Sequence, residues 1–270
     1  MVEFTYDWLR FEGYLGNVGQ GNNRFECHML ALSRLFRLIR GNNMSEDSNV
    51  PIEQVNEMKE RINVTLKRLR DELATYWTST GEVPSFIIGK PAPILPQDAL
   101  NECLLYPHRD ALLDTLPKSG IVAEVGTQYG HWAEMILDVS SPKELHLFDL
   151  DFDNLNPKVN DSKNVRKHRG DSSKELSAVQ DNMFDWIYID GDHSYDGVKR
   201  DIQQAVTKIK TDGILVFNDY CIWSHVEAIP YGVVAAVNEL LQDGWRMSAL
   251  ALSPWGYWDV AVRRIRKSVR

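Results

Sequence analysis

The second half of the chain alternates short apolar runs with longer amphipathic segments, and this alternation limits the fold more than any other feature. Four runs have the length and composition of buried strands: residues 121–125, 144–148, 184–189 and 213–217. The segments between them repeat apolar residues every three or four positions, as in Val198, Ile202, Val206 and Ile209. Strands that alternate with helices build a mostly parallel sheet with right-handed crossovers.

The last part of the chain adds a different connection. A predicted helix at 232–241 is followed by two apolar runs, 246–252 and 257–263, which only a short Ser-Pro-Trp-Gly segment separates. That segment is too short for a crossover, so the two runs predict an antiparallel hairpin. A basic segment, 164–170, predicts a weaker strand at an incompletely covered position of the sheet. The predicted fold class is α/β.

Residues 1–115 carry helical periodicity and few strand signals. One amphipathic helix is predicted over 24–40 and a longer one over 51–77, which begins at Pro51. The apolar seam of the longer helix packs either against its own domain or against a second subunit, in a homo-oligomer. We therefore predict a helical region, 1–97, that serves oligomerisation or covers a substrate. The proline-rich segment 89–97 is the predicted linker to a second domain, 98–270.

Composition excludes several classes of partner. The formal net charge of −8 disfavours a nucleic-acid partner, because phosphate binding needs basic surface, and the one basic run is the chain end at 263–270. No segment approaches the roughly 18 apolar residues of a membrane span, so we expect no membrane partner. The N-terminal residues contain acids and no basic leader region. Three widely spaced cysteines suggest neither disulfides nor zinc, and the predicted location is the cytoplasm.

The loop after the first predicted strand has the features of a nucleotide-binding turn. Gly126 and Gly130 allow a tight turn before a helix, but Gln128 stands where the dinucleotide fingerprint requires its second glycine, which disfavours NAD. The second strand ends at Asp149, close to the roughly 20-residue spacing that places a carboxylate on ribose hydroxyls. Asp151 is the alternative, and a solvated acidic loop is the plainer explanation.

Further polar residues follow the other strands at the same edge of the sheet. Asp171 could accept a hydrogen bond from an adenine amine, or it could cap the following helix. Asp190, Asn218 and Asp219 end two adjacent strands, which lie about 4.8 Å apart. Three oxygen donors with room for water suit Mg²⁺, although a carboxylate would bind more strongly than the amide of Asn218.

These motifs together resemble a known family. The segments AEVGTQYG, LHLFDLD, HRGDSS, FDWIYIDGDHSYDGVKRDI and GILVFNDY follow the order and spacing of class I S-adenosylmethionine-dependent methyltransferases. DGDHSY followed by FNDY is similar to the metal-dependent O-methyltransferase branch that includes macrolide-sugar methyltransferases. The resemblance covers about residues 105–263 and implies a Rossmann-like seven-stranded sheet with an antiparallel last strand. Segment 152–164 departs from it, because it leaves little room for the usual helix.

The resemblance also implies roles for individual residues. His193 is the expected catalytic base, and Mg²⁺ would be held by Asp190, Asn218 and Asp219. The positions that match the cofactor-binding motifs are Glu124, Gly126, Gly130, Asp149, Asp171, Ser172 and Asp190. Asp192 and Ser194 are expected to cap the helix that follows, Trp186 and Tyr188 to belong to the core, and His108, Arg109 and His225 to flank the cleft.

The predicted function is methylation of a hydroxyl on a small polyhydroxylated acceptor, such as a sugar or a glycosylated natural product. Two alternatives stay open. A metal-independent methyltransferase of the same fold would use His193 or a carboxylate as its only base, and a non-catalytic protein would bind the nucleoside without turnover. A nicotinamide oxidoreductase fits least well, because of Gln128.

Overall fold

The computed structural model describes residues 51–265 of the chain, and it divides into two compact units between Pro84 and Ser85. The described part of the first unit is one long helix, α3 (Ile52–Thr80), which follows Pro51 as predicted. Gly81 ends the helix in the left-handed conformation, and its N–H donates to the carbonyl of Trp77 at 2.8 Å. The helix predicted over 24–40 lies outside the described residues.

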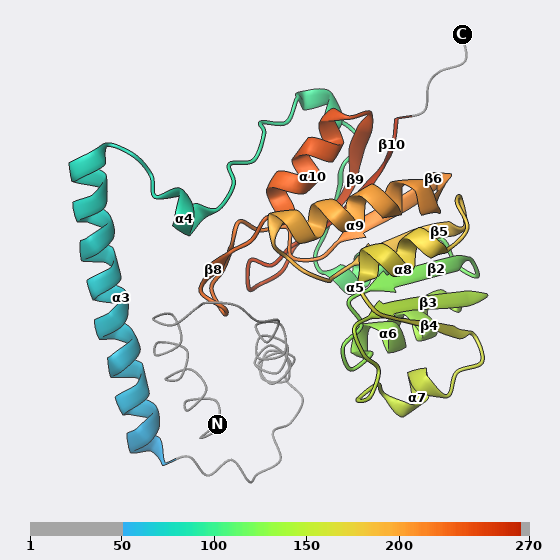
Figure 1. The fold of residues 1–270 in the computed structure, drawn as a ribbon, viewed down its shortest axis with the longest axis horizontal. Coiled ribbons are helices and arrows are strands. Elements are labelled where there is room, and N and C mark those ends of the chain that lie inside the picture. The colour runs from blue at the N-terminus through green and yellow to red at the C-terminus, as the bar shows by residue number, and fades with distance from the viewer. Residues whose placement is uncertain (1–50, 266–270) are drawn as a thin grey trace. The chain divides into compact units, whose positions relative to one another are not determined.

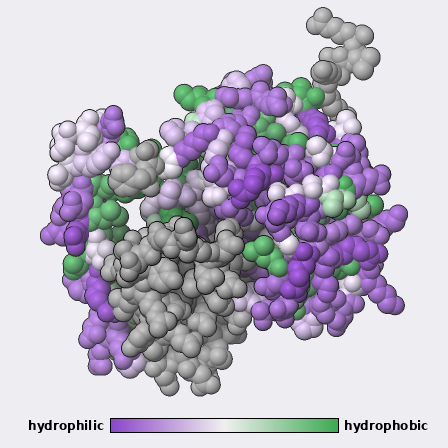
Figure 2. Space-filling model, in the orientation of Figure 1, coloured by the Kyte–Doolittle hydropathy of each residue, from purple (hydrophilic) through white to green (hydrophobic). Residues whose placement is uncertain are grey.

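The middle of the apolar seam of α3 is exposed, and its two ends are partly buried. No residue of this helix is buried, and Ile62, Leu66 and Leu69 are 55%, 49% and 40% exposed. Figure 2 shows hydrophobic residues among hydrophilic ones along the helix. Both alternatives for the seam, packing on its own domain or on a second subunit, remain predictions.

The second unit is built on one large sheet. Its strands follow the order β1-β9-β10-β6-β5-β2-β3-β4, and β10 alone runs antiparallel to its neighbours (Figure 1). The mostly parallel sheet and the final hairpin are therefore confirmed. The bounds are β1 (Leu104–Tyr106), β2 (Ile121–Val125), β3 (Glu144–Asp149), β4 (Val165–Arg169), β5 (Phe184–Ile189), β6 (Ile209–Phe217), β9 (Trp245–Ala251) and β10 (Asp259–Arg264).

The sheet has eight strands where seven were expected. The additional strand is β1, a three-residue segment that pairs in parallel with β9. Ile209, predicted to end a helix, is instead the first residue of β6, because that strand continues back to pair Ile209 with Phe184. A separate pair of two-residue strands, β7 (Trp223–Ser224) and β8 (Ile229–Pro230), lies in the loop after β6.

Helices cover both faces of the sheet. One buried cluster joins α8, α9 and α10 to residues such as Ile187 and Ile189, and the other joins α5 and α6 to Trp186 and Tyr188. Successive residues of β5 thus point to opposite faces, as a strand requires. The helices are α4 (Ser85–Ile88), the 3₁₀ turn η1 (Gln97–Ala99), α5 (Arg109–Thr115), α6 (His131–Ser140), α7 (Pro157–Asn160), α8 (Ser172–Ala178), α9 (Tyr195–Lys208) and α10 (Val233–Gln242).

Two weaker features of the sequence have clear counterparts in the structure. Strand β4 is the edge strand, and its basic residues are largely exposed, as its sequence predicted. Helix α7 has only four residues, so segment 152–164 does leave out a full crossover helix. Among the described residues, no helix is both long and apolar enough to span a bilayer.

The segment predicted to be a linker packs on α10. The Asn238 side-chain amide donates to the carbonyl of Pro93 at 2.8 Å, and the amide of Gln242 donates to that of Ile94 at 3.4 Å. Lys90 forms an ion pair with Glu239 at 3.0 Å. Residues 85–97 therefore belong to the second unit, whereas the predicted helical domain extended to residue 97.

Candidate active site

The turn after β2 depends on two glycines for its shape. Gly126 has a φ of 84°, and a Cβ there would lie 2.0 Å from the carbonyl oxygen of Asp190. Gly130 has a φ of 75°, and a Cβ there would lie 2.6 Å from Cδ1 of Leu155. Both predicted cofactor glycines are thus already required by the protein's own packing, and their contact with a cofactor remains a prediction.

Asp149 fixes this turn from the end of β3. Its Oδ2 accepts hydrogen bonds from the backbone N–H groups of Thr127 and Gln128, at 2.8 and 2.7 Å, and the side chain is buried. The predicted role on ribose hydroxyls is not tested by this geometry. The sequence did not predict the structural role, in which one carboxylate oxygen holds two N–H groups of the glycine turn.

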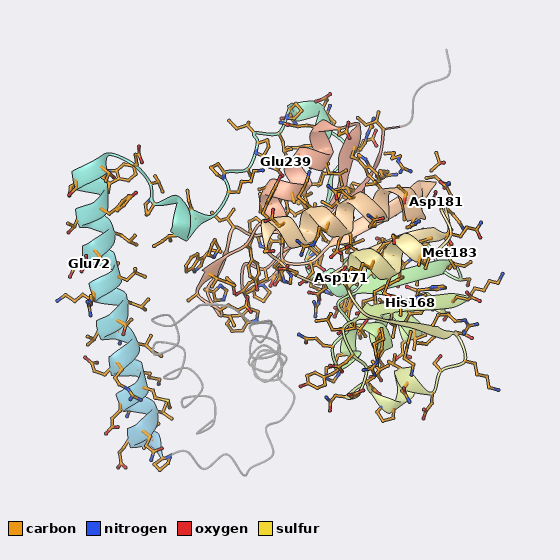
Figure 3. The ribbon with its side chains drawn as sticks, viewed as in Figure 1. Glu72, His168, Asp171, Asp181, Met183 and Glu239 are labelled. Atoms are coloured by element: carbon orange, nitrogen blue, oxygen red, sulfur yellow. The ribbon has the colours of Figure 1, made fainter. Side chains whose placement is uncertain are left out.

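The residues after β4 have local partners. Asp171 caps α8 (Figure 3), because its Oδ1 accepts from the Lys174 N–H at 3.1 Å and from the Ser173 hydroxyl at 2.8 Å. These hydrogen bonds lower the pKa of Asp171. The Ser172 hydroxyl donates to Asp201 on α9 at 2.6 Å. The capping alternative for Asp171 is confirmed, and adenine contacts by Asp171 and Ser172 remain predictions.

His193 lies between two carboxyl groups after β5 and β6. Its Nε2 is 3.5 Å from Oδ1 of Asp190 and 3.8 Å from Oδ2 of Asp219, and its ring stacks on Tyr231 with centroids 4.6 Å apart. Asp192 and Ser194 cap the start of α9, as predicted: Ser194 accepts from the Gly197 N–H, and Asp192 from that of Ser194. The structure therefore brings the predicted base and two predicted acids together.

A buried polar network lies beside this group. The Tyr188 hydroxyl donates to Oδ2 of Asp259 at 2.6 Å, and the amide of Asn218 donates to Oδ1 of Asp259 and to the Tyr188 hydroxyl, both at 3.1 Å. The ring of Tyr188 belongs to the core, as predicted, but its hydroxyl belongs to the site. Sequence reasoning missed Asp259. One feature of the sequence could have predicted it: Asp259 begins the last strand, and an antiparallel strand begins at the edge where the parallel strands end.

Arg109 brings a positive charge to the same site. It is the first residue of α5, and its guanidinium lies over the Trp132 ring, 4.4 Å from the centroid. Burial opposes its charge, but Tyr188, Asp259 and Asp190 outweigh burial and raise its pKa. The other two residues predicted to flank the cleft have local roles: His108 caps α5, and His225 packs on Tyr257.

Burial changes the ionisation of the acids at this edge. It raises the pKa of Glu124 to about 8, that of Asp219 to about 7 and that of Asp259 to about 6. Burial and the neighbouring charge of Asp219 raise the pKa of Asp190. Burial has the opposite effect on a base and lowers the pKa of His193, so its imidazole is neutral at physiological pH.

Unpaired polar atoms concentrate at this edge of the sheet. Seven buried side-chain nitrogen or oxygen atoms of the described residues have no hydrogen-bond partner, and only Ser140 Oγ and Arg246 Nε lie elsewhere. Buried polar atoms are usually paired, so such a concentration indicates a site for a bound molecule. The other five are Glu124 Oε2, Thr127 Oγ1, Trp132 Nε1, His193 Nε2 and Asn218 Oδ1.

The arrangement does not fit the predicted magnesium site well. Within residues 51–265, no three His, Cys, Asp or Glu side chains are placed to hold a metal ion. An imidazole nitrogen stands near both Asp190 and Asp219, and the guanidinium of Arg109 already supplies positive charge to Asp190. Asn218 Oδ1 is the one atom that favours a metal, because it is buried and unpaired. Magnesium prefers oxygen ligands and keeps part of its water shell, whereas here a nitrogen and a cationic side chain stand beside the two carboxyl groups.

Comparison with known proteins gives one family match and distant similarities to solved structures. Residues 123–220 match the family described as "Methyltransferase domain". A search of curated proteins found no match. Among solved structures, the N-methyltransferase NodS from Bradyrhizobium japonicum WM9 is 16% identical, with a TM-score of 0.45 over 58% of this chain and 95% of its own. A protein from Corynebacterium glutamicum is 18% identical, with a TM-score of 0.46 over 75% and 100%.

The matched segment runs from β2 to the loop after β6, and so includes the glycine turn, Asp149, Asp190, His193 and Asp219. Residues 123–220 of the second unit therefore match a methyltransferase domain, and methyl transfer from S-adenosylmethionine is the activity that this match supports.

Proposed function

We propose that this protein is an S-adenosylmethionine-dependent methyltransferase, that it methylates an oxygen of a small polyhydroxylated acceptor, such as a sugar or a glycosylated natural product, and that His193 is the base. The observation that carries the proposal is the partly buried, neutral imidazole of His193, whose Nε2 atom is itself buried and has no hydrogen-bond partner. An alcohol is a poor nucleophile until its proton is removed, so O-methylation needs a base that is unprotonated at working pH.

The balance of the reaction is simple. The sulfonium of S-adenosylmethionine supplies an activated methyl group, and the acceptor oxygen forms a bond to that carbon as the carbon–sulfur bond breaks. The hydroxyl proton passes to His193, and the sulfur leaves as a neutral thioether. The nearby acids Asp190 and Asp219 can stabilise the imidazolium that results, since both lie within 4 Å of Nε2.

The cofactor would be held near Glu124 and the glycine turn, away from His193. The unpaired Oε2 of Glu124 and hydroxyl of Thr127 offer acceptors for a cationic group, and a buried carboxyl without a partner suits an ammonium or sulfonium ligand. Asp149 holds the turn between them, so its predicted ribose contact and its structural role would act together. This division separates cofactor binding from the acceptor chemistry.

The test is calorimetric titration with S-adenosylhomocysteine, followed by an acceptor screen. We expect Asp149→Asn to weaken nucleoside binding at least about tenfold, because the turn loses acceptor strength, whereas Asp190→Asn keeps binding and loses turnover. Ser173→Ala, beside the α8 cap, is the matched control and should keep both. Nucleoside binding by the wild-type protein without turnover on any hydroxylated acceptor would favour the non-catalytic alternative. Loss of binding in both Asp variants would contradict the division of roles.

A further inference from the structure

The site has more carboxyl groups than cationic side chains. Four carboxyl groups lie at this edge. Those of Glu124, Asp219 and Asp259 are buried and that of Asp190 is partly buried, and the guanidinium of Arg109 acts electrostatically on all four. The ionised form of a buried carboxyl group is costly unless a positive charge lies nearby to compensate it.

Arg109 is placed for this role by three features. It begins α5, whose first turn is capped by His108. Its guanidinium lies over the Trp132 ring, 4.4 Å from the centroid, and Trp132 in turn packs on Tyr188, with ring centroids 5.0 Å apart. A guanidinium over an indole gains cation–π attraction, which is stronger where water is excluded.

The guanidinium is not taken up by a direct ion pair. Within residues 51–265, Asp190 and Asp219 lie within 4.0 Å of one basic side chain, that of His193. Arg109 forms no ion pair within 4.0 Å with any of the four carboxyl groups in this part of the chain. Its charge therefore acts on several carboxyl groups and is not fixed to one of them. A planar donor fork of this kind can bind an oxygen anion directly.

We infer that Arg109 supplies the positive charge that the acceptor site needs, in the place where related enzymes are expected to use a divalent cation. This inference rests on the proposed O-methylation and explains why the donor set fits magnesium poorly. Arg109 would compensate Asp190 and Asp219 while the acceptor hydroxyl loses its proton to His193. Turnover should then be insensitive to chelators.

The test measures metal affinity rather than activity. Titration with MnCl₂ at pH 8, followed by the free Mn²⁺ electron paramagnetic resonance signal, reports whether the acids can hold a metal. We expect weak binding by the wild-type protein and, for Arg109→Met, affinity higher by on the order of tenfold, because removal of the guanidinium leaves the carboxyl groups uncompensated. Arg109→Lys keeps a positive charge and should behave as the wild type. Arg263→Met, an exposed arginine on β10, is the matched control.

The double variant Arg109→Met with Asp190→Asn locates the effect, since it should lose the gain in Mn²⁺ affinity. Equal Mn²⁺ affinity in the wild type and Arg109→Met would overturn the inference, and so would tight binding by the wild type that Asp190→Asn removes. A parallel titration with S-adenosylhomocysteine keeps the two proposals apart. Absence of nucleoside binding would contradict the proposed function, whereas the Mn²⁺ result would still decide the role of Arg109.

Discussion

Two polar clusters lie on the same sheet, one partly buried and one largely buried, and they differ in how completely they are paired. At the edge formed by β3 and β4, His146 Nδ1 lies 2.9 Å from His168 Nε2, and His146 Nε2 lies 3.2 Å from Glu144. Arg166 reaches the other oxygen of Glu144 at 3.3 Å, and His168 stacks on Phe148. None of these side chains has a buried unpaired atom among the described residues.

The cluster at the carboxyl edge is the opposite case. His193 Nε2, Asn218 Oδ1 and Glu124 Oε2 are buried there without partners, although donors and acceptors lie close by. A cluster whose polar atoms all pair with one another stabilises the fold and needs no ligand. Buried polar atoms without partners lower stability, and they are retained where a ligand can pair them. Pairing, rather than the kinds of residue present, distinguishes the functional cluster from the structural one.

The largest expected effect is on turnover at the unpaired cluster. His193→Asn removes the base and keeps a polar side chain, so the rate of O-methylation should fall by about 10²–10⁴-fold. Binding of S-adenosylhomocysteine should change little, because His193 lies on the acceptor side of the site. Steady-state kinetics and calorimetry measure the two quantities. His168→Asn, in the paired cluster, is the control and should keep wild-type turnover; full activity in His193→Asn would remove the proposed base.

A smaller effect concerns the pH dependence of stability, where the two clusters have opposite signs. Burial and the neighbouring His146 lower the pKa of His168 from 6.5 to about 4. The unfolded chain therefore binds more protons than the native protein between these values, and the edge cluster loses stability as the pH falls from about 6.5 to 4. After allowance for partial exposure, the loss is about 1–2 kcal/mol.

Asp259 has the reverse dependence. Burial raises its pKa from 3.8 to about 6, so the native protein binds more protons than the unfolded chain between these values. Its contribution is present at low pH and is lost as the pH rises through about 6. Urea unfolding from pH 4 to 7 measures both effects on the free energy of unfolding. As the pH falls from about 6.5 to 4, that of His168→Gln should decrease less than that of the wild type. As the pH falls through about 6, that of Asp259→Asn should lack the gain that Asp259 gives the wild type. Identical curves for the two variants would mean that the clusters do not differ in this way.

The sequence predicted the framework of the site because strand ends are local features. Asp149, Asp190, Asn218 and Asp219 each follow an apolar run, and the rule that parallel strands end at one edge brings them together. What a sequence cannot supply is the direction of a side chain. Asn218 directs its amide nitrogen at Asp259 and Tyr188, and so serves a polar network.

The part of the site that the sequence did not predict depends on long-range packing. Asp259, which was missed, reaches the site from the antiparallel strand β10. Arg109 was expected to flank the cleft, but its charge reaches the acids from α5, before β2. Neither stands in a motif, so only tertiary packing shows that they share a site. Strand β1 was missed for a different reason: its three residues carry too little periodicity to predict a strand.

The smallest expected effect is at the paired cluster, where Arg166→Ala should lower the free energy of unfolding by no more than about 1 kcal/mol. Arg166 is 48% exposed, and Glu144 keeps His146 as a partner when the guanidinium is removed. Thermal and urea unfolding measure the change. Arg109→Met should cost more than Arg166→Ala, because it leaves buried acids uncompensated. If both substitutions lowered the free energy of unfolding equally, compensation of buried charge would not distinguish the two clusters. The contrast between a cluster that pairs with itself and one that awaits a ligand would then be wrong.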